Sequence, residues 1–229
     1  MIIGCALFME LLDATAVLTA LPQLAADFGE SSVRMNLVVT LYLLAVAIFI
    51  PLSGWLAERL GPRRVFIAAI SLFIVSSLAC ALSASLWQLS LARFFQGMAG
   101  ALMVPVGQVI LLRWAGKGDL MRAMAWLTLP ALLGPVFGPL LGGVLVTWLS
   151  WHWIFLVNLP IGLLGIFLVL RHVPDYPGLR NQVFDLGGFL LVSPALACLV
   201  LAFETLGHGS LHWTCLLYTS PSPRDKRQS

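Results

Sequence analysis

The stretch Ala123–Trp148, AMAWLTLPALLGPVFGPLLGGVLVTW, contains no charged residue. A helix needs about 20 mostly apolar residues to cross the hydrocarbon core of a bilayer, and this stretch is long enough to do so. It is apolar on every side rather than along one stripe, as a helix embedded in lipid is. Strands of a membrane barrel would be about ten residues long and would alternate in polarity, unlike this run. The stretch therefore predicts a transmembrane helix.

Six more apolar runs of this kind lie on either side of it. Of the 229 residues, 60% are hydrophobic and 10% are charged, whereas an average soluble domain is about 25% charged. These proportions exclude a soluble globular protein and a disordered one, and the net charge of +3 indicates no nucleic-acid partner. We predict an all-α protein embedded in the lipid bilayer, with further spans at Ile2–Leu21, Met35–Ala57, Val65–Leu82, Leu86–Leu112, Trp153–Leu170 and Leu186–Leu206.

The basic residues of the predicted loops lie mostly on one side of the membrane. The loops after the second, fourth and sixth spans carry Arg59, Arg63, Arg64, Arg113, Lys117, Arg122, Arg171 and Arg180. The opposite loops carry only Arg34. Because loops rich in lysine and arginine stay in the cytoplasm, we expect a multi-pass protein whose N-terminus is also cytoplasmic.

Ionisable side chains inside the spans are candidates for function, because each costs at least about 2.5–3.5 kcal/mol at the centre of the bilayer. Glu10 and Asp13 are three residues apart in the first span and share one helix face. Two neighbouring carboxylates in a low-dielectric medium do not both ionise easily, so the pair is suited to taking up and releasing a proton. A structural cation that neutralises Asp13 is the alternative interpretation.

Arg93 and Gln96 share a face of the fourth span with two glycines. Because arginine stays protonated in proteins, a buried Arg93 needs an acid, a carbonyl group or water beside it. We predict Asp13 or Glu10 as its partner. The alternative is that Arg93 extends towards the outer membrane surface.

The fifth span carries Gly134, Gly138 and Gly142 at intervals of four, with Pro139 and two other prolines between them. Such glycines form a flat ridge that lets a second helix approach closely, and the prolines bend the helix. The pattern fits both a moving gate and tight packing alone.

No nucleophile elbow, phosphate-binding loop or cluster of metal ligands occurs in the sequence. The four cysteines have neither metal-ligand spacing nor the pattern of a disulfide framework. We therefore expect no enzymatic activity, no cofactor and no metal site.

The last residues differ from the rest in composition. Cys215–Asp225, CLLYTSPSPRD, resembles the translated read-through of a sequencing-library adapter. We expect residues 215–229 to be non-native and leave them out of the functional argument. The native chain would then stop near Thr214, and the sequence would be a truncated piece of a longer protein.

Four motifs, in order, resemble those of the major facilitator superfamily, and specifically of its 14-helix drug:proton antiporter family. Leu11–Pro22 (LLDATAVLTALP) is similar to the signature of the first helix, and Gly54–Arg64 (GWLAERLGPRR) to the loop between helices 2 and 3. Arg93–Pro105 (RFFQGMAGALMVP) is similar to the motif of the fourth helix, and Gly134–Gly143 (GPVFGPLLGG) to the antiporter motif. The resemblance to the 14-helix branch rests on Phe184–Gly209.

The resemblance implies roles for the matched residues. Proton coupling and substrate contact would involve Asp13, Glu10, Arg93 and Gln96. A cytoplasmic gating loop would comprise Gly54, Glu58, Arg59, Gly61, Arg63 and Arg64, with Glu58 in place of the usual aspartate. The antiporter motif would comprise Gly134, Gly138, Pro139, Gly142 and Gly143.

The family also implies an architecture. Residues 1–170 would form an N-terminal six-helix bundle of two inverted three-helix repeats. A cytoplasmic loop at 171–185, a seventh helix at 186–206 and the start of an outer loop at 207–214 would follow, and then the tail at 215–229.

The function implied is proton-coupled export of drug-like or toxic small molecules across the bacterial inner membrane, with a periplasmic adaptor protein left open as a partner. Two alternatives remain. One is an importer or metabolite exporter of the same fold. The other is a transport-inactive sensor or assembly partner.

Overall fold

Eight helices and their connections make up the part of the chain that the computed structural model describes, which is residues 2–114, 120–175, 177–179 and 184–208. No strand occurs in these residues. The helices are α1 (Ile2–Phe28), α2 (Ser32–Leu60), α3 (Pro62–Ala81), α4 (Leu86–Trp114), α5 (Leu120–Trp148), α6 (His152–Leu156), α7 (Asn158–His172) and α8 (Leu186–His208).

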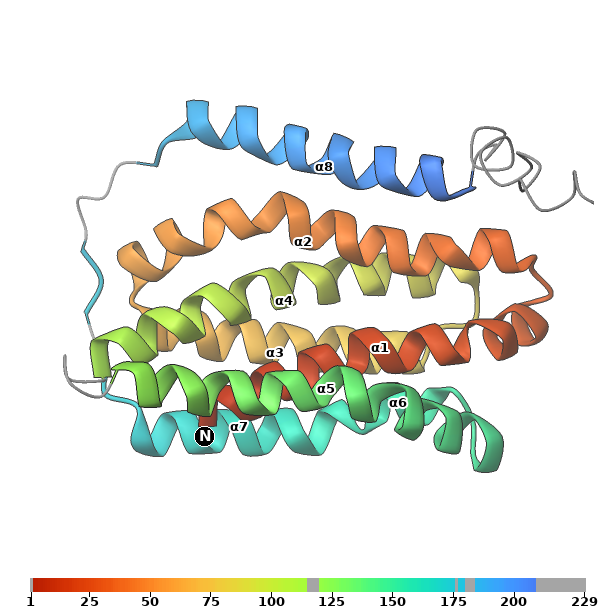
Figure 1. Cartoon of the computed structure of the whole chain (residues 1–229), viewed down its shortest axis with the longest axis horizontal. Helices are drawn as coiled ribbons and strands as arrows, with labels where there is room; N and C mark the ends of the chain where they lie inside the picture. Colours follow the sequence, from red (N-terminus) through yellow and green to blue (C-terminus); the bar gives the residue numbers. More distant parts are fainter. Residues whose placement is uncertain (1, 115–119, 176, 180–183, 209–229) are drawn as a thin grey trace, which may run out of the picture.

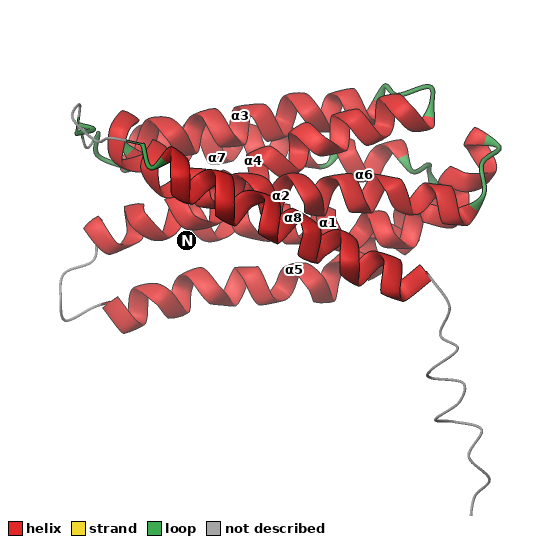
Figure 2. Cartoon of the chain, turned by 90° about the horizontal axis from the view of Figure 1, so that it is seen from above, coloured by secondary structure: helices red, strands yellow, loops and turns green. Residues whose placement is uncertain are grey.

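Seven segments of this described part are long and apolar enough to cross a membrane, with α6 and α7 counting together as one segment. The helices run side by side, so that successive connections alternate between the two ends of the bundle (Figures 1 and 2). The structure thereby confirms the prediction of an all-α, multi-pass membrane protein. The expected tail at 215–229 and all but the first two residues of the expected outer loop at 207–214 lie outside the described residues.

Two helical segments differ from the predicted spans. α1 continues past Pro22 to Phe28 and ends at Gly29, whose φ of +63° favours glycine. Glu30 N–H then donates to the carbonyl of Ala25 at 3.0 Å, which closes the end of the helix. This polar end was missed because the prediction followed hydropathy alone.

The predicted span Trp153–Leu170 is divided between α6 and α7, which meet at Val157. Pro160 lies in the first turn of α7 and has no N–H to donate to the carbonyl of Leu156, the last residue of α6. A proline is well suited to the first turn of a helix, where its missing N–H needs no partner, so its position is compatible with a new helix that begins at Asn158. Asn158 is thereby placed at the beginning of a helix rather than in the middle of one.

The most extensive helix pairs are α1 with α5 and α2 with α4. α3 packs on α4 and α7, α7 also packs on α1, and α8 lies on α2 (Figures 1 and 2). In two three-helix repeats, α1 corresponds to α4 and α2 corresponds to α5. Replacing each helix by its counterpart turns the α1–α5 pair into the α4–α2 pair. The packing therefore has the symmetry expected of two three-helix repeats.

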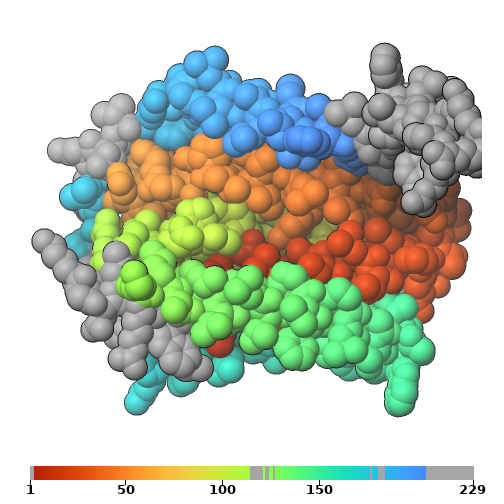
Figure 3. Space-filling view, viewed as in Figure 1, coloured from red at the N-terminus to blue at the C-terminus, as the bar shows by residue number. Residues whose placement is uncertain are grey.

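Two clusters of buried apolar side chains fill the bundle. One contains Leu7, Phe66, Phe73 and Met103, and the other contains Leu24, Met35, Leu89 and Trp151, each with neighbours of the same kind. On the face shown in Figure 3, α1 is visible between α2 and α5, and α8 lies along the outside of α2. Leu18 of α1 is half exposed. The polar residues described next lie between the two apolar clusters.

Candidate functional site

An ion pair between Asp13 of α1 and Arg93 of α4 lies inside the bundle. Nη1 of Arg93 is 2.5 Å from Oδ2 of Asp13, and the two side chains are 2% and 0% exposed. This confirms the pairing predicted for Arg93 with an acid of the first helix. It also shows that the guanidinium does not extend to the membrane surface. A buried ion pair needs further hydrogen bonds to satisfy its remaining polar atoms.

Gln96 of α4, Ser77 of α3 and Asn158 of α7 supply most of these bonds. Arg93 Nη1 donates to Oε1 of Gln96 at 2.7 Å, and Nε2 of Gln96 donates to the hydroxyl of Ser77 on α3 at 2.7 Å. Nδ2 of Asn158 donates to Oδ1 of Asp13 at 2.7 Å and contacts the same Ser77 oxygen at 3.3 Å. All five side chains are buried. We call Asp13, Arg93, Gln96, Ser77 and Asn158 the central network.

Two aromatic rings cover the guanidinium of Arg93. Its Cζ lies 5.4 Å from the ring centre of Tyr42 on α2 and 5.0 Å from that of Phe155 on α6. Rings at this distance attract a cation and exclude water from it. The two rings therefore stabilise the charge of Arg93, whose Nε atom has no hydrogen-bond partner among the described residues.

Glu10 lies one turn of α1 before Asp13, but it is not part of the central network. Its side chain is 6% exposed, and a Cβ added at Gly100 of α4 would be 2.8 Å from its Oε1 and 3.2 Å from the hydroxyl of Tyr42. The other oxygen, Oε2, has no hydrogen-bond partner among the described residues. The sequence places Glu10 nearer the cytoplasmic end, where contact with water is expected, but the structure buries it.

Glycines on α4 allow α2 to come close. A Cβ at Gly97 would collide with the carbonyl oxygen of Tyr42 and would be 3.0 Å from Cβ of Ala45. Gly97 and Gly100 therefore allow Tyr42 to lie against both Arg93 and Glu10. These glycines leave room for the neighbouring helix, because glycine adds no side chain at a helix crossing.

The glycine ridge of α5 packs on the part of α1 that carries Asp13. A Cβ at Gly134 would be 2.7 Å from Cβ of Leu11, and one at Gly138 would be 3.1 Å from the carbonyl oxygen of Leu12 and would collide with the Thr15 hydroxyl. One at Gly142 would be 2.8 Å from the carbonyl oxygen of Ala16. This confirms the predicted close approach.

The other two residues of the antiporter motif lie away from this contact. A Cβ added at Gly143 would meet nothing within 4 Å, and Pro139 is exposed. The packing function of the motif thus belongs to three of its five residues. A dynamic role for the ridge stays a prediction.

The turn between α2 and α3, together with the first residues of α3, is attached to the end of α7 and to the segment that follows it. Gly61 has a φ of +91°, which favours glycine and reverses the chain between the two helices. Nη2 of Arg63 donates to the carbonyl of Leu170 at 2.6 Å, and Arg64 forms an ion pair with Asp175 at 3.1 Å.

Arg59 and Glu58, which belong to the same predicted gating loop, make contacts of other kinds. Arg59 lies over the ring of Trp55 at 4.8 Å, and the backbone carbonyl of Glu58 accepts from Leu179 N–H at 2.8 Å. Among the described residues, no ion pair joins the Glu58 carboxylate to an arginine of the loop. A Cβ at Gly54 would meet nothing within 4 Å. The gating role of the loop stays a prediction.

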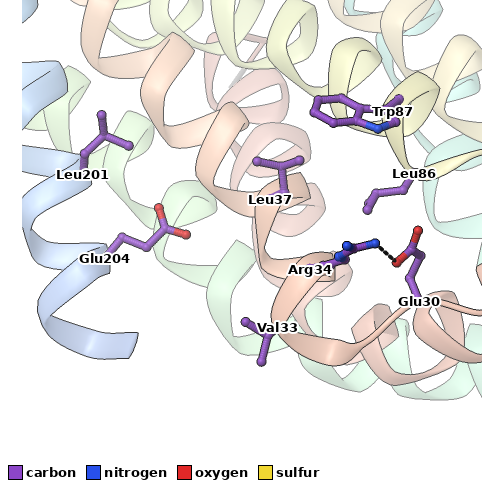
Figure 4. A pocket seen from close by; sticks show the side chains of 8 residues that line it. All are labelled: Glu30, Val33, Arg34, Leu37, Leu86, Trp87, Leu201 and Glu204. Atoms are coloured by element: carbon purple, nitrogen blue, oxygen red, sulfur yellow. Dashed lines mark hydrogen bonds and ion pairs between the residues drawn. The ribbon is translucent and has the colours of Figure 1, made fainter. Parts of the chain in front are cut away.

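A cavity of about 560 Å³ lies at the opposite end of the bundle, between α2, α4 and α8 (Figure 4). Its charged lining residues are Glu30, Arg34 and Glu204, with Glu30 and Arg34 paired at 3.1 Å. Thr40 of α2 donates a hydrogen bond to Glu204 of α8, and Ser193 of α8 donates to the carbonyl of Ile48 at 2.9 Å. These two bonds attach α8 to α2.

Sequence reasoning missed Asn158, Ser77 and Tyr42. These three are uncharged, and hydropathy and charge within the spans do not distinguish them from structural residues. Asn158 carried a usable signal, because an amide in an apolar run, beside a proline that ends a helix, has to be hydrogen-bonded when buried. Ser77 and Tyr42 carried no signal of this kind.

A sequence model described as the Major Facilitator Superfamily matches residues 3–221, which include the spans that position the central network. The chain belongs to the major facilitator superfamily. Its relatives include the "Putative multidrug resistance protein MdtD" of Salmonella paratyphi B and that of Salmonella newport. Each is 47% identical over 214 residues, which are 93% of this chain and 45% of the relative. The chain thus spans about half the length of the curated relatives it matches.

Proposed function

We propose that the intact protein exports drug-like or toxic small molecules in exchange for protons. The observation that carries the proposal is the buried ion pair of Asp13 and Arg93, at the meeting point of both three-helix repeats. Charges at this depth are costly and are kept where they serve transport or proton movement. Membership of a transporter superfamily and 47% identity to relatives named multidrug resistance proteins support the same conclusion.

The mechanism we infer uses a change of charge beside Arg93. Protonation of a first-helix acid, Asp13 or Glu10, alters the balance between the carboxylates and the guanidinium. A ligand, including a proton, shifts a conformational equilibrium only if it binds the two states differently. A charge pair that links α1 to α4 meets this requirement, because any relative movement of these helices changes its energy.

The glycine ridge of α5 would transmit the movement. Since Gly134, Gly138 and Gly142 lie directly on α1 around Asp13, a shift of α1 has to be accommodated by α5. Gln96 would hold Arg93 in place, and the α2–α3 loop would act as the cytoplasmic gate through Arg63 and Arg64. We retain the assignment to the 14-helix branch and the residue limits of the domains as parts of this proposal.

We also propose that the protein lies in the bacterial inner membrane with its N-terminus in the cytoplasm. The N-terminal end of α1 lies at the same end of the bundle as the α2–α3 turn (Figure 1), where Arg59, Arg63 and Arg64 are found. That basic end corresponds to the cytoplasmic side. A periplasmic adaptor protein remains a candidate partner at the opposite end.

Transport by the intact protein in proteoliposomes tests the proposal. An imposed pH gradient should drive movement of ethidium, rhodamine 6G or norfloxacin, and Asp13→Asn should lower the rate at least tenfold. Glu30→Gln serves as the control, because it also removes a carboxylate but lies outside the central network. Gradient-driven transport that is unchanged in Asp13→Asn, or absent for the whole panel in the wild type, would contradict the proposal.

A further inference from the structure

The two acids of α1 have different surroundings, although they are one helical turn apart. Asp13 has both carboxylate oxygens engaged, Oδ2 by Arg93 at 2.5 Å and Oδ1 by Asn158 at 2.7 Å. A carboxylate that receives a cation and an amide donor is stabilised in its ionised form. Asp13 is thus held as the anion of a completed ion pair.

Glu10 has no such partners. Its Oε2 is buried without a hydrogen bond, and among the described residues no cation forms an ion pair with it. The charged side chain that acts on Glu10 most directly is Asp13, which is an anion and repels a second negative charge. An ionised carboxylate in these surroundings would be uncompensated, whereas a neutral carboxylic acid loses little by burial.

The groups around Glu10 on the other helices do not change this balance. From α2, Tyr42 presents its hydroxyl close to the Glu10 carboxyl group, and it is neutral in its ordinary form. From α4, Gly100 faces the Glu10 carboxyl group and has no side chain. Arg93, the cation of α4, is committed to Asp13 and Gln96 and is covered by Tyr42 and Phe155.

We propose that Glu10, rather than Asp13, takes up and releases the proton that drives transport, while Asp13 remains the ionised partner of Arg93. The inference rests on the proposed function and deepens it. In the state described, an O–H bond at Oε2 of Glu10 makes the acid neutral. Release of that proton to the aqueous phase leaves a carboxylate one turn from the Asp13–Arg93 pair. The new anion competes with Asp13 for Arg93, and opening the site to water or moving α4 relieves the repulsion.

Infrared spectroscopy of the intact protein in lipid nanodiscs tests this assignment without requiring transport. A protonated carboxylic acid has a carbonyl band separate from those of amides and carboxylates. The wild type should show a band of this kind at neutral pH. Glu10→Gln should remove it, and both the double variant Asp13→Asn/Arg93→Gln and the control Glu30→Gln should keep it.

The other outcomes contradict the assignment. Absence of the band in the wild type, its persistence in Glu10→Gln, or its loss in Asp13→Asn/Arg93→Gln would each overturn it. The double variant is used because it removes both charges together, whereas Asp13→Asn alone leaves Arg93 free to pair with an ionised Glu10.

Transport measurements then separate the two proposals. Glu10→Gln should lose at least tenfold in pH-gradient-driven ethidium transport, yet it should still exchange ethidium down its own concentration gradient at any pH. Glu10→Asp should restore part of the coupling. If no drug is transported by the wild type, the proposed function fails, while the infrared result still decides which acid holds the proton.

Discussion

Asp13 and Arg93 stabilise each other only as a pair. Removing one partner of a buried ion pair leaves an uncompensated charge and typically costs about 3–5 kcal/mol, whereas replacing both by neutral groups is often tolerated. Both side chains are almost fully buried. We therefore expect a single substitution to be costly here and the double substitution to be tolerated.

We therefore predict that Arg93→Gln is destabilised by about 3–5 kcal/mol and that the double variant Asp13→Asn/Arg93→Gln recovers most of that loss. Thermal unfolding of the intact protein in detergent measures both. Transport should be absent in both variants, since neither has the charge pair. A double variant that is less stable than Arg93→Gln would contradict the pairing.

Ser77 and Ser76 offer a matched pair of neighbouring buried hydroxyls. Ser77 accepts hydrogen bonds from Gln96 and Asn158 on other helices, while Ser76 donates to carbonyls of its own helix. Ser77→Ala should cost about 1–3 kcal/mol because it leaves buried amide donors without an acceptor, and Ser76→Ala should cost clearly less. Equal melting temperatures for the two variants would exclude a linking role for Ser77.

At the scale of helices, the glycines Gly134, Gly138 and Gly142 bring the backbone of α5 directly against α1. Gly138 lies against Thr15 and Leu12, whereas Gly143 of the same helix faces open space. Adding a methyl group where there is no room typically costs about 1–3 kcal/mol. Adding one to an exposed helix position stabilises the helix by up to about 1 kcal/mol.

We predict that Gly138→Ala lowers the melting temperature of the intact protein and slows transport, and that Gly143→Ala does neither. The comparison distinguishes a packing ridge from a general need for glycine in α5. If both substitutions slow transport while leaving stability unchanged, flexibility of the helix would be the better explanation.

In the turn between α2 and α3, a glycine is needed for its backbone conformation rather than for close packing. Gly61 has a φ of +91°, and a residue with a side chain is strained there by about 1–2 kcal/mol. Gly61→Ala should therefore destabilise the protein by that amount, and Gly54→Ala, in the same motif but with free space around it, should not. Melting temperatures of the two variants provide the measurement, and a stable Gly61→Ala protein would contradict the geometry.

At the scale of the whole molecule, the basic loop residues lie mostly at one end of the bundle, and we predict that this end faces the cytoplasm. Ala84 lies between α3 and α4, at the end opposite to Leu60, the last residue of α2 (Figure 1). Both positions are exposed. In a variant without native cysteines, Ala84→Cys should react with a membrane-impermeant maleimide applied from outside the inner membrane. Leu60→Cys should react only after that membrane is permeabilised. The reverse pattern would place the N-terminus outside.

The sequence by itself determined where the helices are. Whether a run of about 20 residues enters a bilayer depends on its own hydropathy, so the seven spans could be predicted without knowing their neighbours. The presence of charges that need partners, and of a glycine ridge on α5, followed from the same local reasoning. Hydropathy did not indicate that α1 continues through a polar end to Phe28, or that the sixth span, His152–His172, is broken between α6 and α7.

Only the tertiary structure decided which groups meet. Asp13 contacts Arg93 and Asn158, which lie 80 and 145 residues away along the chain. Whether Arg93 would pair with Asp13 or Glu10 depended on how α1 and α4 lie relative to each other, which the residue spacing along either helix does not show. Asp13 and Glu10 are one helical turn apart, yet Asp13 has two hydrogen-bonding partners and Oε2 of Glu10 has none among the described residues. The spacing of residues along α1 does not predict this difference, because the partners of Asp13 come from other helices.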